Sequence, residues 1–181
     1  MTGGLVRIAG PDDAAALLGL KQRLDQETAF MLLEPGERDT SVQALADELG
    51  ATARSGNSIV IVADSGEELA GYVELTGGPF RRNRTTAYLV MGVTAEASGQ
   101  GLGTALLTEA KRWAADHDVH RLELTVMAHN HRAADLYQRL GFSVEGRRAQ
   151  CLVIDGQFVD ELYMAIVLVR PRRRADNGAI A

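Results

Sequence analysis

Apolar residues spaced three or four positions apart predict four helices in this chain. The expected N-cap of the first helix is Asp12, and that of the second is Thr40 or Ser41. The other two helices are predicted at residues 101–116 and 131–140. Each carries its apolar residues on one side, so all four are expected to pack against a shared layer.

Alternating apolar and polar positions, or short unbroken apolar runs, predict the strands. They fall at residues 5–9, 59–63, 69–76, 86–93, 121–127, 142–152 and 158–169. The last two are separated by Asp155-Gly156, a strong signal for a hairpin turn. The order of elements predicts an α/β fold with a mixed central sheet of about seven strands, flanked by about four helices.

Three glycines stand where the strand at 86–93 gives way to the helix at 101–116. Gly99, Gly101 and Gly103 allow a tight bend and a close approach of a ligand to the backbone. The first turn of a helix also offers unpaired N–H groups and the positive end of the helix dipole. The junction therefore predicts a cradle for a pyrophosphate.

Other phosphate-binding loops fit this junction less well. A Walker loop needs a Gly-Lys-Ser/Thr sequence, which is missing here. A dinucleotide fold needs Gly-x-Gly-x-x-Gly near the start of a parallel sheet, whereas these glycines follow several strands. Taken alone, the spacing also fits a glycine-rich turn with a helix cap.

A second motif favours a ligand cradle. Residues 122–142 contain the pattern Asn-x-x-Ala-x-x-Leu-Tyr-x-x-x-Gly-Phe, carried by Asn130, Ala133, Leu136, Tyr137, Gly141 and Phe142. With the loop Ser98-Gly99-Gln100-Gly101-Leu102-Gly103, it closely resembles the GNAT acetyltransferase superfamily over roughly residues 85 to 165. That family has Arg or Gln where this chain has Ser98, so a cation near the phosphates is missing there.

The resemblance implies a mostly antiparallel sheet whose strands Thr86–Val93 and Arg121–Met127 splay apart to receive the pantetheine arm of acetyl-CoA. Members of the family often form homodimers. No metal is expected, because His129 and His131 flank Asn130 without further ligands and make a poor zinc site. The residues expected to bind acetyl-CoA are Met91, Val93, Ser98, Gly99, Gln100, Gly101, Gly103, Thr104, Asn130, Ala133 and Tyr137.

The expected reaction is direct transfer of an acetyl group to a primary amine of a small molecule or of a protein N-terminus. By resemblance, Tyr137 is the general acid for the departing thiolate, a role open to a phenol. The general base stays open among Glu34, Glu74, Glu123 and water. The alternative function is a regulatory domain that binds acyl-CoA without catalysis.

Composition restricts the remaining functions. The chain has 181 residues, of which 46% are hydrophobic, and a net charge of −5. We expect one N-acetyltransferase domain over residues 1–170 and a flexible, Arg-rich tail over 171–181. The negative net charge disfavours nucleic acid as a partner. No apolar run is long enough for a membrane span. With Cys151 as its single cysteine, the protein is expected to be cytoplasmic.

Overall fold

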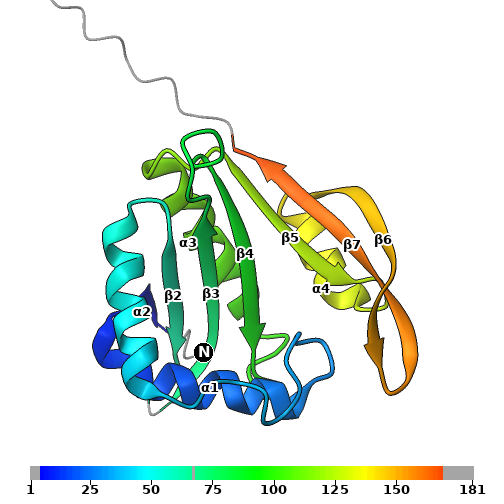
Figure 1. The fold of residues 1–181 in the computed structure, drawn as a ribbon, viewed down its shortest axis with the longest axis horizontal. Coiled ribbons are helices and arrows are strands. Elements are labelled where there is room, and N and C mark those ends of the chain that lie inside the picture. The colour runs from blue at the N-terminus through cyan, green and yellow to red at the C-terminus, as the bar shows by residue number, and fades with distance from the viewer. Residues whose placement is uncertain (1–4, 67, 169–181) are drawn as a thin grey trace, which may run out of the picture.

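The computed structural model describes residues 5–66 and 68–168. Its strands are β1 (Leu5–Ile8), β2 (Ile59–Asp64), β3 (Leu69–Gly77), β4 (Thr86–Val93), β5 (Arg121–Met127), β6 (Ser143–Ile154) and β7 (Gln157–Val167). They form one seven-stranded sheet in the order β1-β2-β3-β4-β5-β7-β6 (Figure 1). Within it β4 and β5 are parallel, and the other neighbouring strands are antiparallel. This confirms the expected mixed, mostly antiparallel sheet.

Helices cover both faces of the sheet. They are α1 (Ala14–Glu27), α2 (Val42–Ser55), α3 (Leu102–Asp116) and α4 (His131–Arg139). On one face, α1 and α2 pack against Val60, Val62 and Tyr72. On the other, α3 and α4 join the larger core cluster, which includes Ile61 and Leu124. The four predicted helices are confirmed, and α4 lies over the part of the sheet built from β5, β6 and β7 (Figure 1).

The prediction that Asp12 caps the first helix is wrong. Residues Pro11–Asp13 form a single 3₁₀ turn, and α1 begins at Ala14. The neighbouring Asp13 reaches back instead, accepting a hydrogen bond of 2.8 Å from the Gly10 amide and pairing with Arg7. At the second helix, Ser41 rather than Thr40 is the cap, since its Oγ accepts from the Ala44 amide.

The strands β4 and β5 separate soon after they begin. Their pairing is limited to Thr86 with Arg121, Ala87 with Leu122 and Tyr88 with Glu123. Beyond this point the two strands diverge (Figure 1), while β4 keeps its pairing with β3 as far as Val93. This is the splay that the resemblance implied. It leaves the backbone groups of β4 that face β5 without a partner strand.

The strands β6 and β7 form a long hairpin at the end of the described chain. Its loop is Asp155-Gly156, and both residues have positive φ, 50° and 73°, as a type I′ turn requires. The predicted hairpin turn is therefore confirmed. The predicted tail at 171–181 lies outside the described residues.

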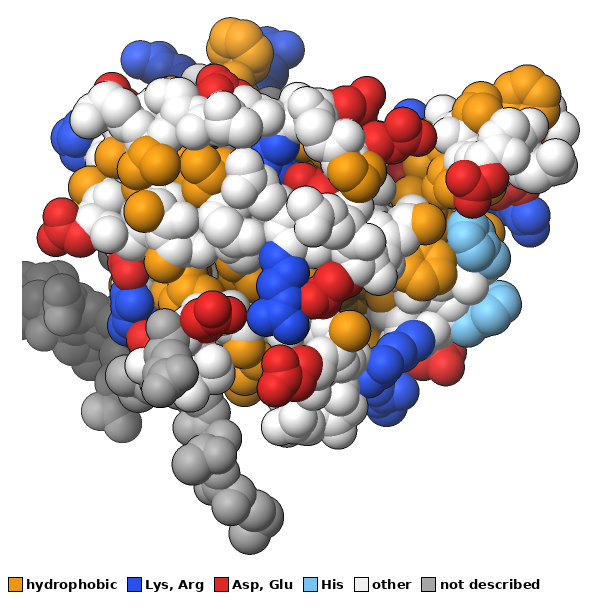
Figure 2. All heavy atoms as spheres, turned by 90° about the horizontal axis from the view of Figure 1, so that it is seen from below, with side chains coloured by type: hydrophobic (Ala, Val, Ile, Leu, Met, Phe, Trp, Pro, Cys, Tyr) orange, Lys and Arg blue, Asp and Glu red, His pale blue; other side chains and the backbone are white. Residues whose placement is uncertain are grey.

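The surface carries charges of both signs. On the face shown in Figure 2, the described acidic and basic side chains are interspersed, with hydrophobic side chains between them. None of the helices within the described ranges is both long enough and apolar enough to cross a bilayer.

Candidate active site

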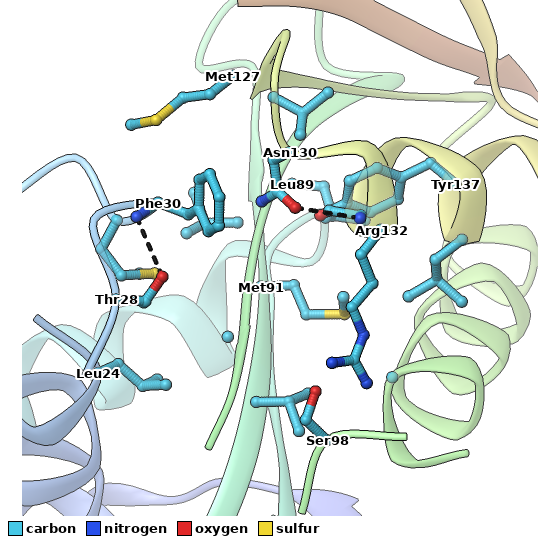
Figure 3. Close-up of a pocket in the computed structure, with 18 of the residues that line it drawn as sticks. Leu24, Thr28, Phe30, Leu89, Met91, Ser98, Met127, Asn130, Arg132 and Tyr137 are labelled. Carbon is cyan, nitrogen blue, oxygen red and sulfur yellow. Dashed lines mark hydrogen bonds between the residues drawn. The ribbon is translucent and has the colours of Figure 1, made fainter. Parts of the chain in front are cut away.

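A cavity of about 660 Å³ opens where β4 and β5 part. Its walls come from the end of α1 and the loop after it, from β4 and the glycine loop, and from the end of β5, α4 and β7. Figure 3 shows side chains from these separate elements facing the same space. The volume lies in the range of about 300–1,000 Å³ that is common for small-molecule sites.

The three glycines of the loop serve two different purposes. Gly99 and Gly101 have φ of +85° and +84°, a left-handed conformation that glycine adopts without strain. Gly103 sits in the first turn of α3, where a Cβ would lie 3.0 Å from the Leu136 side chain. It therefore allows α3 to approach α4 closely.

The N-terminus of α3 opens into the cavity without a side-chain cap. Gly101 is its N-cap residue and provides no side chain, and the first turn has no acidic residue. Gly101, Gly103 and Thr104 all line the cavity. The amide groups of this turn and the helix dipole therefore favour an anion at this end of the cavity.

Most of the residues predicted to bind the cofactor line this cavity. They are Met91, Val93, Ser98, Gly99, Gly101, Gly103, Thr104, Asn130, Ala133 and Tyr137. The exception is Gln100, whose Nε2 donates a hydrogen bond of 2.9 Å to the Glu96 carbonyl oxygen instead. The two sequence motifs, separated by α3 and β5, thus meet at one place.

Asn130 fixes the start of α4. Its Oδ1 accepts a hydrogen bond of 3.2 Å from the Ala133 amide, the bond of an N-cap residue (Figure 3). This cap holds the first turn of α4 against the cavity. The same helix then carries Tyr137, which lies two turns further along.

Tyr137 is buried, with a relative exposure of 6%, yet it lines the cavity. Its ring packs at a tilt against Phe142, with 5.7 Å between the ring centroids. Burial raises the pKa of the Tyr137 phenol above its ordinary value, and Tyr88 adds a smaller effect in the same direction. The hydroxyl therefore stays protonated at neutral and moderately alkaline pH, as a proton donor must.

None of the three carboxylates considered as the general base lines the cavity. Glu74 accepts a hydrogen bond of 2.9 Å from Lys21, and Glu123 one of 3.0 Å from Arg121. Glu34 lies in the loop after α1. Glu74 and Glu123 are thus each held in an ion pair with a basic side chain.

Two other carboxylates line the cavity, Glu27 and Glu161. Glu27 accepts a hydrogen bond of 2.9 Å from the Ala95 amide, which together with Arg23 lowers the pKa of its carboxyl. Glu161 is 7% exposed and accepts a hydrogen bond of 2.7 Å from Arg148. Of these two carboxylates, Glu27 is the one hydrogen-bonded to the backbone of the loop that precedes the glycines.

Sequence reasoning missed Glu161 because its position depends on strand register. The pairing of β5 with β7 places Glu161 opposite Met127, at the mouth of the splay. Arg132 was also missed, although a signal for it exists. It is a cation in the first turn of a helix, where the dipole disfavours positive charge.

The histidines beside Asn130 lie on either side of the N-cap of α4. His129 lies near Phe30, with 5.3 Å between the ring centroids. Across the described ranges, no group of three or more His, Cys, Asp or Glu side chains is placed to hold a metal ion.

Comparison with known proteins identifies the family. The model of the acetyltransferase (GNAT) family matches residues 23–142. The [ribosomal protein uS5]-alanine N-acetyltransferase of Escherichia coli is 33% identical over 99 residues, which cover 54% of this chain and 49% of that protein. Spermidine N(1)-acetyltransferase of the same organism is 31% identical over 110 residues, covering 58% and 56%. The chain therefore matches about half the length of these relatives.

Solved structures share the whole fold. A GNAT-family acetyltransferase from Streptococcus pneumoniae has a TM-score of 0.88 and 32% identity, covering 91% of this chain and 99% of its own. The putative acetyltransferase yncA from Salmonella typhimurium, determined with its cofactor acetyl-CoA, has a TM-score of 0.82 at 22% identity, covering 95% and 98%. The splayed sheet, the glycine loop and the matched family model agree, and the chain belongs to the GNAT acetyltransferase family.

Proposed function

We propose that this protein transfers an acetyl group directly from acetyl-CoA to a primary amine. The observation that carries the proposal is that one cavity holds both the uncapped N-terminus of α3 and the buried hydroxyl of Tyr137. The first suits the phosphates of a coenzyme. The second suits the sulfur that leaves when the acetyl group is transferred.

The residues of the cavity fit acetyl-CoA. In this proposal the amides from Gly99 to Thr104 bind the pyrophosphate. Met91 and Val93 offer backbone groups to the pantetheine arm, since β4 has no partner strand there on its β5 side. Asn130 contributes to the same arm in addition to capping its helix. The 660 Å³ volume accommodates a ligand arm of this size.

Acetyl-CoA, when bound, supplies the activated acetyl group as a thioester. The amine nitrogen forms the new bond to the carbonyl carbon, the carbon–sulfur bond breaks, and the sulfur takes the proton of the Tyr137 hydroxyl. The proton lost by the amine leaves to water or to a carboxylate, and solvent returns a proton to Tyr137. Most of the rate enhancement is expected from holding the two substrates in place.

We assign Glu161 to the acceptor side. A carboxylate with 7% exposure at a cavity wall attracts a cationic amine, and the Arg148 side chain that shields it is half exposed. Amine acceptors, a protein N-terminal alanine and spermidine, are named for two relatives. A primary amine carried by a small molecule or a peptide is therefore the proposed acceptor class.

The test is a panel of primary amines assayed by release of free thiol from acetyl-CoA. The panel should include spermidine, peptides with an N-terminal alanine, and free amino acids. Thiol release that depends on one class of amine supports the proposal. Binding of acetyl-CoA without thiol release with any amine would favour a regulatory domain that binds acyl-CoA without catalysis.

Glu161→Gln tests the acceptor side in the same assay. This variant keeps the size of the side chain and removes its charge. It should raise the KM for the amine by about tenfold, as expected for loss of a charge-assisted hydrogen bond. The KM for acetyl-CoA should stay unchanged. An unchanged KM for the amine would remove Glu161 from the acceptor site.

A further inference from the structure

The loop after α1 places an apolar lip on the cavity. This lip consists of Phe30, Met31 and Leu32, which all line the cavity. Phe30 is 42% exposed and Leu32 is 74% exposed, so both keep apolar surface that a ligand can cover. Figure 3 shows the Phe30 ring directed from this loop into the cavity. An apolar surface at the wall of a small-molecule site favours an apolar group on the ligand.

The lip is held in place at both ends of its loop. The Phe30 amide donates a hydrogen bond of 3.2 Å to Thr28 Oγ1 (Figure 3). Arg38 donates two hydrogen bonds, of 2.7 and 2.8 Å, to the buried carboxylate of Asp25 on α1. A bidentate pair of this kind fixes the orientation of both groups. The loop that carries the lip is therefore tied to α1.

The lip lies at the same end of the cavity as Glu161. The ring centroids of Phe30 and His129 are 5.3 Å apart, which links the loop after α1 to the end of β5. His129 follows Met127 by two residues, and Met127 pairs with Glu161 between β5 and β7. Leu152 on β6 adds a further apolar side chain to the wall. An ammonium group held by Glu161 would therefore have the lip within reach of its substituent.

Glu161 can take one ammonium group. Within the described chain, its carboxylate accepts hydrogen bonds of 2.7 Å from Arg148 and 3.4 Å from Cys151, and both end on Oε2. Across the described residues, no buried side-chain oxygen lacks a partner, so Oε1 is open to solvent. An open carboxylate oxygen at a cavity wall suits one N–H donor of a cation.

A second ammonium group would find no free carboxylate in the described part of the cavity wall. The other carboxylate there, Glu27, is already bound to the Ala95 amide and paired with Arg23. The remaining charged side chains of the wall are those of Arg132 and Arg139, and both are cations. Because burying a charge without a partner is costly, these charges disfavour an acceptor with two ammonium groups.

We propose that the acceptor is a monoamine that carries an apolar group close to its amino nitrogen. The inference rests on the proposed function and narrows its acceptor class. Glu161 attracts the amine, and the lip of Phe30, Met31 and Leu32 covers the apolar group. An arylalkylamine and a peptide whose second residue is apolar share this chemistry, whereas a polyamine such as spermidine does not.

The experiment compares amines that differ only in the apolar group, by thiol release from acetyl-CoA. One pair is phenylpropylamine and propylamine, the other is alanyl-leucinamide and alanyl-glycinamide, and spermidine is assayed beside them. In at least one pair, the apolar member should have a kcat/KM about tenfold or more above that of its partner, as expected for covering one apolar side chain. Spermidine should have a lower kcat/KM than that apolar amine.

The variants Phe30→Ser and Phe80→Ser assign the preference to the lip. Phe80 is an exposed phenylalanine in the turn before β4, and it does not line the cavity. Phe30→Ser should lower the ratio of the two kcat/KM values in the preferred pair by about fivefold or more, and Phe80→Ser by less than about twofold. Because both amines are assayed on one preparation, this ratio does not depend on the folded fraction of the protein.

The pair that shows the preference identifies the source of the amine. The dipeptide amides stand for a peptide N-terminus, and the simple amines stand for a small molecule. Equal kcat/KM values within both pairs, spermidine as the best acceptor, an unchanged ratio in Phe30→Ser or an equal fall in both serine variants would overturn the proposal. Absence of thiol release with every amine would refute the proposed function, and this inference with it.

Discussion

At the scale of single residues, the ring and the hydroxyl of Tyr137 lie in different surroundings, so its role in packing and its role as a proton donor can be tested separately. Its ring is enclosed by core residues such as Phe142, while its hydroxyl reaches the cavity wall. The raised pKa keeps the phenol protonated, and the hydroxyl is then the group that distinguishes tyrosine from phenylalanine at this position. Its chemical role can therefore be tested without emptying the core.

Tyr137→Phe should lower kcat by about 100-fold or more, within the range for loss of a general acid. Acetyl-CoA affinity and unfolding temperature should change little, because the aromatic contacts remain. Tyr72→Phe is the matched control, since Tyr72 is a buried tyrosine that does not line the cavity. A kcat for Tyr137→Phe within about threefold of the wild type would rule out the acid role.

At the scale of elements, sequence patterns predict β4, the glycine loop and α3, which line the cavity. The separation of β4 from β5 was expected only from the resemblance to the family. Periodicity identifies β4 and β5, but it does not show that their pairing stops at Tyr88 and Glu123. That depends on which strands become neighbours, which is settled by the whole sheet. The glycine loop can be predicted because a left-handed backbone conformation favours glycine, which is visible in the sequence.

Residues that come together through pairing between distant strands cannot be identified from the local sequence in this way. Glu161 reaches the cavity through the register of β7 against β5, and this register cannot be read from the sequence of either strand alone. The error at Asp12 is local: two adjacent aspartates competed for one cap, and the chain used Asp13. Choosing between them requires the path of the backbone at Gly10.

Asn130 allows a prediction about α4 as an element. Asn130→Ser keeps an oxygen able to cap the Ala133 amide, whereas Asn130→Ala removes it. The alanine variant should therefore lose about 1 kcal/mol of unfolding free energy, and the serine variant much less. If Asn130 also contacts the pantetheine arm, both variants should raise the KM for acetyl-CoA. A wild-type KM for Asn130→Ser would limit Asn130 to its capping role.

At the scale of the whole molecule, burial of phenols couples stability to alkaline pH. Burial is the largest cause that raises the pKa of Tyr72, and the Tyr137 phenol is raised in the same way. An unfolded tyrosine ionises near pH 10, whereas these folded tyrosines stay protonated. Above pH 10 the unfolded chain therefore binds fewer protons than the folded one, and stability falls as pH rises.

Urea unfolding at pH 9 and pH 11 measures this coupling. Each buried phenol should cost about 1.4 kcal/mol per pH unit above pH 10. Tyr72→Phe should therefore lose less stability than the wild type between the two pH values. An equal loss in both proteins would show that ionisation of Tyr72 does not contribute.

The central claim is that the glycine loop at the start of α3 holds acetyl-CoA. Its most direct test is a calorimetric titration of acetyl-CoA into the wild type, Gly101→Ala and Gly101→Asp. Both variants strain the same backbone position, at φ +84°, and a new Cβ there meets no atom within 4 Å. They differ in the carboxylate that aspartate adds to the cradle.

The account predicts that Gly101→Asp binds acetyl-CoA at least about tenfold more weakly than Gly101→Ala, because the added negative charge repels the pyrophosphate. Thermal unfolding checks that both variants are folded, and Gly101→Asp should unfold no lower than Gly101→Ala, because Gly101 is the N-cap residue of α3 and aspartate is a favourable cap. Equal affinity of the two variants for acetyl-CoA, or a wild type that does not bind it, would contradict the claim.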